Sequence, residues 1–186
     1  RALSAAGKQL MVTLVIGGAA SGKSEFAESL VLQMGTLPRW YIATMQPFDD
    51  ECRERIRRHR KMRAEKQFET IECFTRLEQV LLPKRGVVLL ECMSNLVANE
   101  LYSPDGAGDC AIESIQRGLE ALRSQCQELV IVSNEVFSGG SSYEGDTLRY
   151  LQILARVNRM LAQQADIVYE VFCGVPVCHK GKGRTT

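Results

Sequence analysis

The most constraining feature of this sequence is the segment GGAASGKS at Gly17–Ser24, which matches the pattern G-x-x-x-x-G-K-S. A short apolar, β-branched run, Val12–Ile16, precedes it, and apolar residues recur at three- and four-residue steps from Lys23 to Met34. A buried strand, a tight turn and a helix are therefore predicted in that order. Backbone N–H groups of such a turn point inward around phosphate oxygens, and the helix start adds a favourable dipole. The segment predicts a phosphate-binding loop, or P-loop.

Two side chains of this loop have expected roles with a nucleoside triphosphate. Lys23 is expected to reach the β- and γ-phosphates, and the Ser24 hydroxyl to ligate Mg²⁺. Glu91 ends the apolar run VVLL at 87–90, the place where P-loop enzymes carry an acidic residue that faces the nucleotide and its metal. The alternative for Glu91 is a solvent-exposed carboxylate at the end of a strand. The metal-site prediction is thus Ser24 with Glu91.

Strand and helix patterns alternate along the rest of the chain. Apolar strand runs are expected at 40–44, 70–72, 87–91, 129–133 and 167–172, and helical patterns at 49–65, 112–122 and 148–161. Residues 175–179 are expected to return as an antiparallel edge strand. The order predicts a P-loop NTPase (RecA-like) three-layer α/β fold, with a mostly parallel sheet covered by helices on both faces. Ligands of such sheets bind at the carboxyl ends of the strands, where Asn134 and Glu135 are either site residues or ordinary turn residues.

Composition bounds the remaining possibilities. The 186 residues suit one catalytic domain spanning 11–186, with 1–10 interpreted as an extension before a natural start at Met11. A net charge of +1 argues against a nucleic-acid partner. The seven cysteines form an odd set without a C-x-x-C pair, which favours a reducing cytoplasm. The longest apolar runs are strand-sized, so no membrane span is expected.

A cluster of seven basic residues surrounds His59 on the helix predicted at 49–65. Such a run is most often a solvated face, and phosphate or nucleic-acid binding is the alternative. A single histidine without a spaced partner is usually structural or exposed. Nearby positive charge would lower the pKa of His59 and leave a ring nitrogen free to attack an α-phosphate, which is chemistry suited to nucleotidyl transfer.

Several separated segments together resemble one family. They are VIGGAASGKS at 15–24, YIAT at 41–44, DE at 50–51, RIxxHR at 55–60, TIE at 70–72, LLEC at 89–92, VSNEV at 132–136 and VN at 157–158. In this order they are similar to the bifunctional adenosylcobinamide kinase/adenosylcobinamide-phosphate guanylyltransferase family of cobalamin biosynthesis. The resemblance runs from Met11 to about Lys180. The P-loop alone is shared by many enzymes, whereas RIxxHR together with SNEV is far more specific.

The resemblance implies a transferase with two activities. The family phosphorylates adenosylcobinamide with ATP or GTP and then attaches GMP from GTP, carried on a histidine, to give adenosylcobinamide-GDP. His59 is then the guanylylated nucleophile, with Lys23 as the second catalytic residue. The resemblance also implies a homotrimer. The nucleotide-binding residues implied are Gly17, Gly18, Ala19, Ala20, Ser21, Gly22, Lys23, Ser24, Ala43, Thr44, Met45, Arg60, Lys61, Met62, Arg63, Glu72 and Glu91.

The chain departs from the family pattern at three places. Ala20 stands where the family usually has Arg, FSGGSS at 137–142 replaces a Gly-x-Gly-Ile-Val-Pro segment, and YLQ at 150–152 replaces a Phe-Arg-Asp pattern. The rival interpretations are a P-loop small-molecule kinase without covalent nucleotide, a RecA-like ATPase or nucleic-acid-binding module, and a nucleotide-binding regulatory protein without catalysis. An acid-labile nucleotide adduct separates the first from the family, and steeply salt-dependent binding to DNA or RNA would indicate the second.

Overall fold

The computed structural model describes residues 10–35, 38–47, 50–136 and 144–183, and for residues 51, 52, 55, 59 and 62 it describes the backbone only. Most of the extension proposed at 1–10, and the segment 137–142 that departs from the family pattern, therefore lie outside the described residues. A seven-stranded sheet is the centre of the described fold. Its strands are β1 (Met11–Gly17), β2 (Arg39–Ala43), β3 (Phe68–Glu72), β4 (Val87–Glu91), β5 (Glu128–Asn134), β6 (Ile167–Phe172) and β7 (Val175–Lys180).

The strand order is β3-β2-β4-β5-β1-β6-β7, and every pairing is parallel except that of β6 with β7. The antiparallel edge strand expected after residue 174 is confirmed. One strand, β5, separates β1 from β4, so the carboxyl ends of these three strands lie in a row. The P-loop after β1 and Glu91 at the end of β4 therefore lie about two strand spacings, roughly 10 Å, apart in the sheet.

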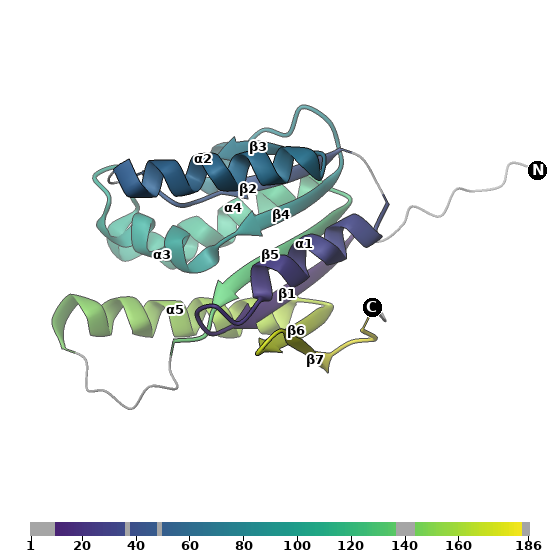
Figure 1. Cartoon of the computed structure of the whole chain (residues 1–186). Helices are drawn as coiled ribbons and strands as arrows, with labels where there is room; N and C mark the ends of the chain where they lie inside the picture. Colours follow the sequence, from purple (N-terminus) through teal and green to yellow (C-terminus); the bar gives the residue numbers. More distant parts are fainter. Residues whose placement is uncertain (1–9, 36–37, 48–49, 137–143, 184–186) are drawn as a thin grey trace, which may run out of the picture.

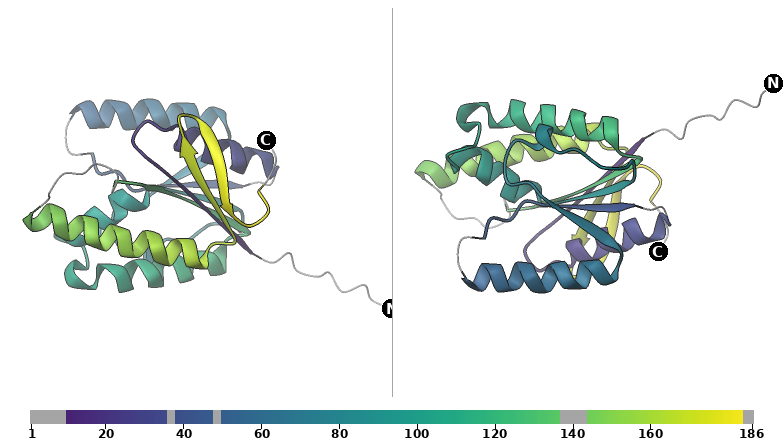
Figure 2. Two further views of the ribbon diagram at one scale, coloured as in Figure 1. Left: turned by 90° about the horizontal axis from the view of Figure 1, so that it is seen from below. Right: turned by 90° about the horizontal axis from the view of Figure 1, so that it is seen from above.

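Helices cover both faces of the sheet (Figure 1). They are α1 (Lys23–Gln33), α2 (Asp50–Glu65), α3 (Met93–Tyr102), α4 (Ala111–Gln125) and α5 (Gly145–Gln164), with short 3₁₀ turns η1 (Leu77–Gln79) and η2 (Gly108–Cys110). Figure 2 shows α1 and α2 on one face and α3, α4 and α5 on the other. The predicted three-layer P-loop fold is confirmed.

Alternating side chains of the central strands fill two separate cores. On β4, Val87 and Leu89 pack with α1, whereas Val88 and Leu90 pack with α3, α4 and α5. Burial on both faces explains why the strands read as continuous apolar runs instead of alternating patterns. The sequence interpretation did not identify α3, in which Leu96, Val97 and Leu101 face the core but buried polar residues interrupt the apolar pattern.

Candidate nucleotide site

The P-loop joins β1 to α1, as the sequence predicts. Gly22 precedes the helix with φ of 87°, and the Lys23 ammonium donates a hydrogen bond to the Gly18 carbonyl at 3.0 Å. A Cβ on Gly17 would lie 2.6 Å from Ser21 Oγ and 2.7 Å from the Val171 carbonyl oxygen, so only glycine fits there. The backbone thus folds closely around the position where phosphates bind in loops of this kind.

Ser24 and Glu91, the two predicted metal ligands, are brought together. Ser24 Oγ donates a hydrogen bond to Glu91 Oε1 across the gap between α1 and β4. Glu91 Oε2 is buried and has no hydrogen-bond partner among the described residues. Burial raises the pKa of the Glu91 carboxyl, against the opposing effects of the Ser24 hydrogen bond and of the Lys23 charge.

The donor set formed by Ser24 and Glu91 fits Mg²⁺. A buried carboxylate oxygen without a partner, next to a hydroxyl, provides the oxygen ligands that this cation prefers. Within the described part of the chain, no three His, Cys, Asp or Glu side chains converge on a metal position. That is expected for Mg²⁺, which usually binds through one or two protein groups, substrate phosphates and water.

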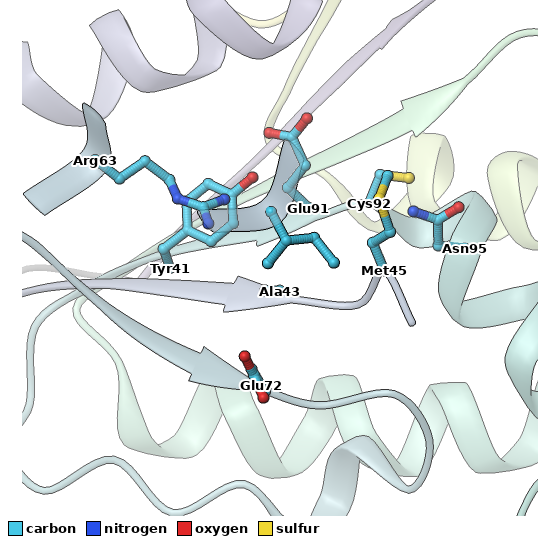
Figure 3. Close-up of a pocket in the computed structure, with 9 residues that line it drawn as sticks. Tyr41, Ala43, Met45, Arg63, Glu72, Glu91, Cys92 and Asn95 are labelled. Atoms are coloured by element: carbon cyan, nitrogen blue, oxygen red, sulfur yellow. The ribbon is translucent and has the colours of Figure 1, made fainter. Parts of the chain in front are cut away.

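A cavity of about 150 Å³ opens beside this pair (Figure 3). This volume is below the range of roughly 300–1,000 Å³ for pockets that enclose a drug-sized ligand, so the cavity fits a part of a nucleotide, such as its base. Its lining residues come from the ends of β2, β3 and β4 and from α2 and α3. They are Tyr41, Ala43, Met45, Ile56, Arg63, Glu72, Glu91, Cys92 and Asn95.

Strand register places the two carboxylates of the cavity on either side of β2. Ala43 pairs with Glu72 of β3 and with Glu91 of β4, and Figure 3 shows the two acidic side chains flanking it. Arg63 reaches in from α2, with its guanidinium carbon 3.7 Å from the centre of the Tyr41 ring. Arg63 is only 6% exposed, and its Nε has no hydrogen-bond partner among the described groups. The cavity therefore combines one cation, two acids and an aromatic face.

The other residues implied by the resemblance occupy different positions. Thr44 is fully buried under the cavity, where its hydroxyl accepts a hydrogen bond from the Cys92 N–H and donates one to the Cys92 carbonyl, both at 2.8 Å. Arg60 lies 3.9 Å from Glu72 as an exposed ion pair. Lys61 is exposed, and for Met62 only the backbone position is described. Thr44 therefore fixes the backbone of Cys92, which lines the cavity, and Arg60 contacts the cavity residue Glu72 from outside.

His59 is described by its backbone alone. It lies on α2, three residues after Ile56 and four before Arg63, and both of these line the cavity. Residues three and four apart share one face of a helix, so position 59 is on the face of α2 that borders the cavity. The three- and four-residue spacing of Ile56, His59 and Arg63 in the sequence predicts the same shared face.

Four lining residues were not among the predicted site residues: Tyr41, Ile56, Cys92 and Asn95. Three of them had a signal, because Tyr41 and Cys92 lie within matching family segments and Ile56 lies on the face of α2 predicted for His59. Asn95 had none, because it lies on α3, the helix that the sequence interpretation did not identify.

A chain of hydrogen bonds connects the strand ends beneath the site. Asn134 Nδ2 donates to Ser94 Oγ at 2.9 Å, and Asn158 Nδ2 of α5 donates to the Asn134 carbonyl at 3.1 Å. Ser133 Oγ donates to Asn158 Oδ1 at 2.6 Å. The Glu135 N–H donates to the Gly17 carbonyl at 2.9 Å. The last two residues of β5 and Glu135, which follows them, therefore connect the P-loop, α3 and α5.

These features define the class of protein. A P-loop joins β1 to α1, and the acidic residue Glu91 ends β4, which is separated from β1 by one strand in a mostly parallel sheet. This is the arrangement of a P-loop NTPase. Solved structures agree. The KaiC-like protein of Pyrococcus horikoshii OT3 superimposes with a TM-score of 0.52 at 10% identity, covering 92% of this chain and 79% of that one. The RadB recombinase superimposes with a TM-score of 0.50 at 14% identity, covering 94% of this chain and 83% of that one. These likenesses support the fold alone.

The family follows from sequence comparison. Residues 13–178 match the cobinamide kinase / cobinamide phosphate guanyltransferase family. The bifunctional adenosylcobalamin biosynthesis protein CobU of Salmonella typhimurium is 36% identical over 182 residues, covering 90% of this chain and 98% of that protein. The bifunctional adenosylcobalamin biosynthesis protein CobP of Pseudomonas aeruginosa is 30% identical over 176 residues, covering 92% and 99%. The chain belongs to this family and is a transferase.

None of the helices in the described part of the chain is both long and apolar enough to span a bilayer.

Proposed function

We propose that this protein phosphorylates adenosylcobinamide with ATP or GTP and then transfers GMP from GTP, by way of His59, to give adenosylcobinamide-GDP. The observation that carries the proposal is the double role of Glu91, which contacts Ser24 of the phosphate loop and also lines the adjacent cavity. Phosphates on the loop and a base in the cavity therefore belong to one continuous site. Family membership gives the substrate class.

Guanine selectivity is assigned to the acidic side chains of the cavity. The guanine edge carries the N1–H and N2–H₂ donors, whereas a carboxylate is an acceptor only. Glu72 is half-exposed at the rim of the cavity and is held near Arg60 at 3.9 Å. Its carboxylate is therefore suited to accept from guanine, and adenine lacks the matching donors at these two positions.

The guanylyl transfer balances as two displacements. A neutral ring nitrogen of His59 forms a bond to the α-phosphorus of GTP, and the α–β bridging bond breaks with its electron pair leaving on pyrophosphate. The ring then loses its extra proton. In the second displacement a phosphate oxygen of the acceptor bonds to the same phosphorus. The phosphorus–nitrogen bond breaks with its electron pair returning to the ring nitrogen, and the ring takes up a proton from solvent to restore the neutral histidine.

The charges around the phosphates come from residues already described. Lys23 and the start of α1 stabilise negative charge on the phosphate oxygens, and Arg63 adds a buried cation at the cavity side. Mg²⁺ bound at Ser24 and Glu91 would neutralise β- and γ-phosphate charge. Transfer of the γ-phosphoryl group to the acceptor hydroxyl needs the same groups, with a nucleoside diphosphate as the leaving group.

The test is intact mass of the purified protein after incubation with Mg²⁺ and GTP. A GMP adduct that is lost in acid is expected for the parent and for His179→Ala, and not for His59→Ala. His179 is the matched control because the chain has only two histidines. His59→Ala should retain phosphorylation of adenosylcobinamide by ATP. No adduct on an active parent protein would instead indicate a small-molecule kinase without covalent nucleotide.

A further inference from the structure

The tip of the β6–β7 hairpin lies against the P-loop. The Gly174 N–H donates a hydrogen bond to the Ser21 carbonyl at 2.8 Å, and a Cβ on Gly22 would lie 3.3 Å from Gly174 Cα. Figure 1 shows this hairpin, in yellow, beside the purple turn between β1 and α1. The hairpin and the phosphate loop are thus fixed to one another through their backbones.

Two large apolar side chains are exposed at this tip. Phe172 is 70% exposed and Val175 is 61% exposed, whereas their neighbour Val171 is buried in the core beneath α1. Phe172 and Val175 are partners in the β6–β7 register, so their side chains lie next to one another on the same face of the hairpin. They form an apolar surface, the tip platform, directly beside the phosphate loop.

The tip platform and the Glu91 cavity lie on opposite sides of the P-loop. The strand order puts β4, with Glu91, two strands from β1 on one side, and β6, with Phe172, next to β1 on the other. A nucleotide on this loop can therefore direct its base to the cavity or to the platform. In a linear triphosphate the α- and γ-phosphorus atoms are at opposite ends. Guanylyl transfer needs the α-phosphorus at the acceptor position, whereas phosphoryl transfer needs the γ-phosphorus there.

We propose that Phe172 and Val175 form a second base subsite, which holds the nucleotide that donates its γ-phosphoryl group. The cavity of Glu72 and Glu91 holds the guanine of the nucleotide that donates GMP. This inference rests on the proposed function and adds to it an assignment of one base position to each step. Reversal of the triphosphate on the loop moves the base from the cavity to the platform and turns the γ-phosphorus toward the acceptor.

The chemistry of the platform predicts its selectivity. Phe172 and Val175 offer only apolar surface, and stacking on an aromatic ring does not distinguish one base from another. ATP and GTP are therefore expected to serve phosphoryl transfer about equally well, within threefold in kcat/KM. Guanylyl transfer, with its base beside carboxylates, is expected to be specific for GTP. A single P-loop would thus combine one permissive and one selective base position.

The first test compares Phe172→Ala with Leu81→Ala, a control at an apolar residue that is 79% exposed and lines a separate hollow beside η1. Phe172→Ala is expected to raise the KM for ATP in phosphoryl transfer about tenfold, corresponding to about 1.4 kcal/mol, with kcat within twofold. The rate of GMP adduct formation from GTP should be unchanged. Leu81→Ala should change neither activity. An unchanged KM for ATP in folded Phe172→Ala would overturn the proposal.

The second test uses a native probe, because Cys173 at the tip is an exposed thiol. Saturating Mg²⁺ with a non-hydrolysable ATP analogue should slow alkylation of Cys173 by iodoacetamide at least fivefold, measured by peptide mass spectrometry. Cys110, an exposed thiol on η2, is the internal control and should react at its original rate. Equal rates at Cys173 with and without the analogue would contradict the base subsite.

Two other outcomes separate the alternatives. If Phe172→Ala lowers the mass of the particle in light scattering while the KM for ATP stays the same, the platform is a contact between copies of the chain and the base subsite is wrong. If the parent protein shows neither phosphoryl transfer nor a GMP adduct, the proposed function fails. In that case protection of Cys173 by the ATP analogue still supports the base subsite, because it requires binding only.

Discussion

Replacement of Asn158 by alanine should destabilise the protein and weaken nucleotide binding. Asn158 is 7% exposed and makes two hydrogen bonds, from Ser133 Oγ and to the Asn134 carbonyl. Loss of two such bonds costs about 1 kcal/mol each, and the fully buried Ser133 hydroxyl left without its acceptor adds about 1–3 kcal/mol if it finds no other. The expected loss of unfolding free energy is therefore about 2–5 kcal/mol. For a domain of this size that is a decrease in Tm of roughly 4–20 °C.

The assay is urea unfolding followed by circular dichroism, with GTP affinity measured in parallel by calorimetry. Gln152→Ala is the matched control, since Gln152 is an exposed residue on the same helix, α5, and should change stability by less than about 0.5 kcal/mol. GTP affinity should fall in Asn158→Ala because Asn134 also donates to Ser94, next to the cavity residue Asn95. Equal stability of the two variants would refute the assignment of this network as a structural support of the site.

Three further predictions concern single side chains. Burial raises the pKa of the Glu91 carboxyl, so its contribution to stability is fully present below the ordinary pKa of 4.5 and is lost as pH rises from there through the folded-state pKa. The Tm of Glu91→Gln relative to that of the parent should therefore increase as the pH of the melt is raised above 4.5. Arg63→Lys keeps the charge but loses the planar stack on Tyr41, and should cost about 1–2 kcal/mol in urea unfolding. In Gly118→Ala the new Cβ would lie 2.5 Å from the Cβ of buried Leu77. This overpacking should outweigh the helix preference of alanine and lower the Tm. A higher Tm for the variant in thermal melts would contradict the packing described.

Much of the sheet could be predicted from sequence because its strands are buried on both faces. Val87–Glu91 and Ile167–Phe172 were predicted with the same bounds that the structure shows, since continuous apolar runs of strand length end there in polar or turn residues. The P-loop was equally clear, because its glycines and its lysine have a fixed spacing. In these segments the local pattern and the tertiary environment specify the same structure.

The rest of the site depends on contacts that spacing does not encode. Helix α3 carries Ser94, Asn99 and Glu100 as buried polar residues, and each is satisfied by a hydrogen bond to a distant part of the chain. Such residues interrupt the apolar periodicity that identifies a helix. The stack of Arg63 on Tyr41 was likewise not predictable, because it joins α2 to β2 across a loop. These features become visible only when the strand order is known.

The contacts around the P-loop have a consequence for the thermodynamics of binding. The Glu135 N–H donates a hydrogen bond to the Gly17 carbonyl, and the Gly174 N–H donates one to the Ser21 carbonyl. The Lys23 ammonium donates one to the Gly18 carbonyl. The loop is therefore ordered before any phosphate arrives, and its conformational entropy is lost during folding instead of during association. Pyrophosphate should bind without a large unfavourable entropy from ordering of the loop, and the amide protons of Glu135 and Gly174, which donate to loop carbonyls, should exchange slowly in the ligand-free protein.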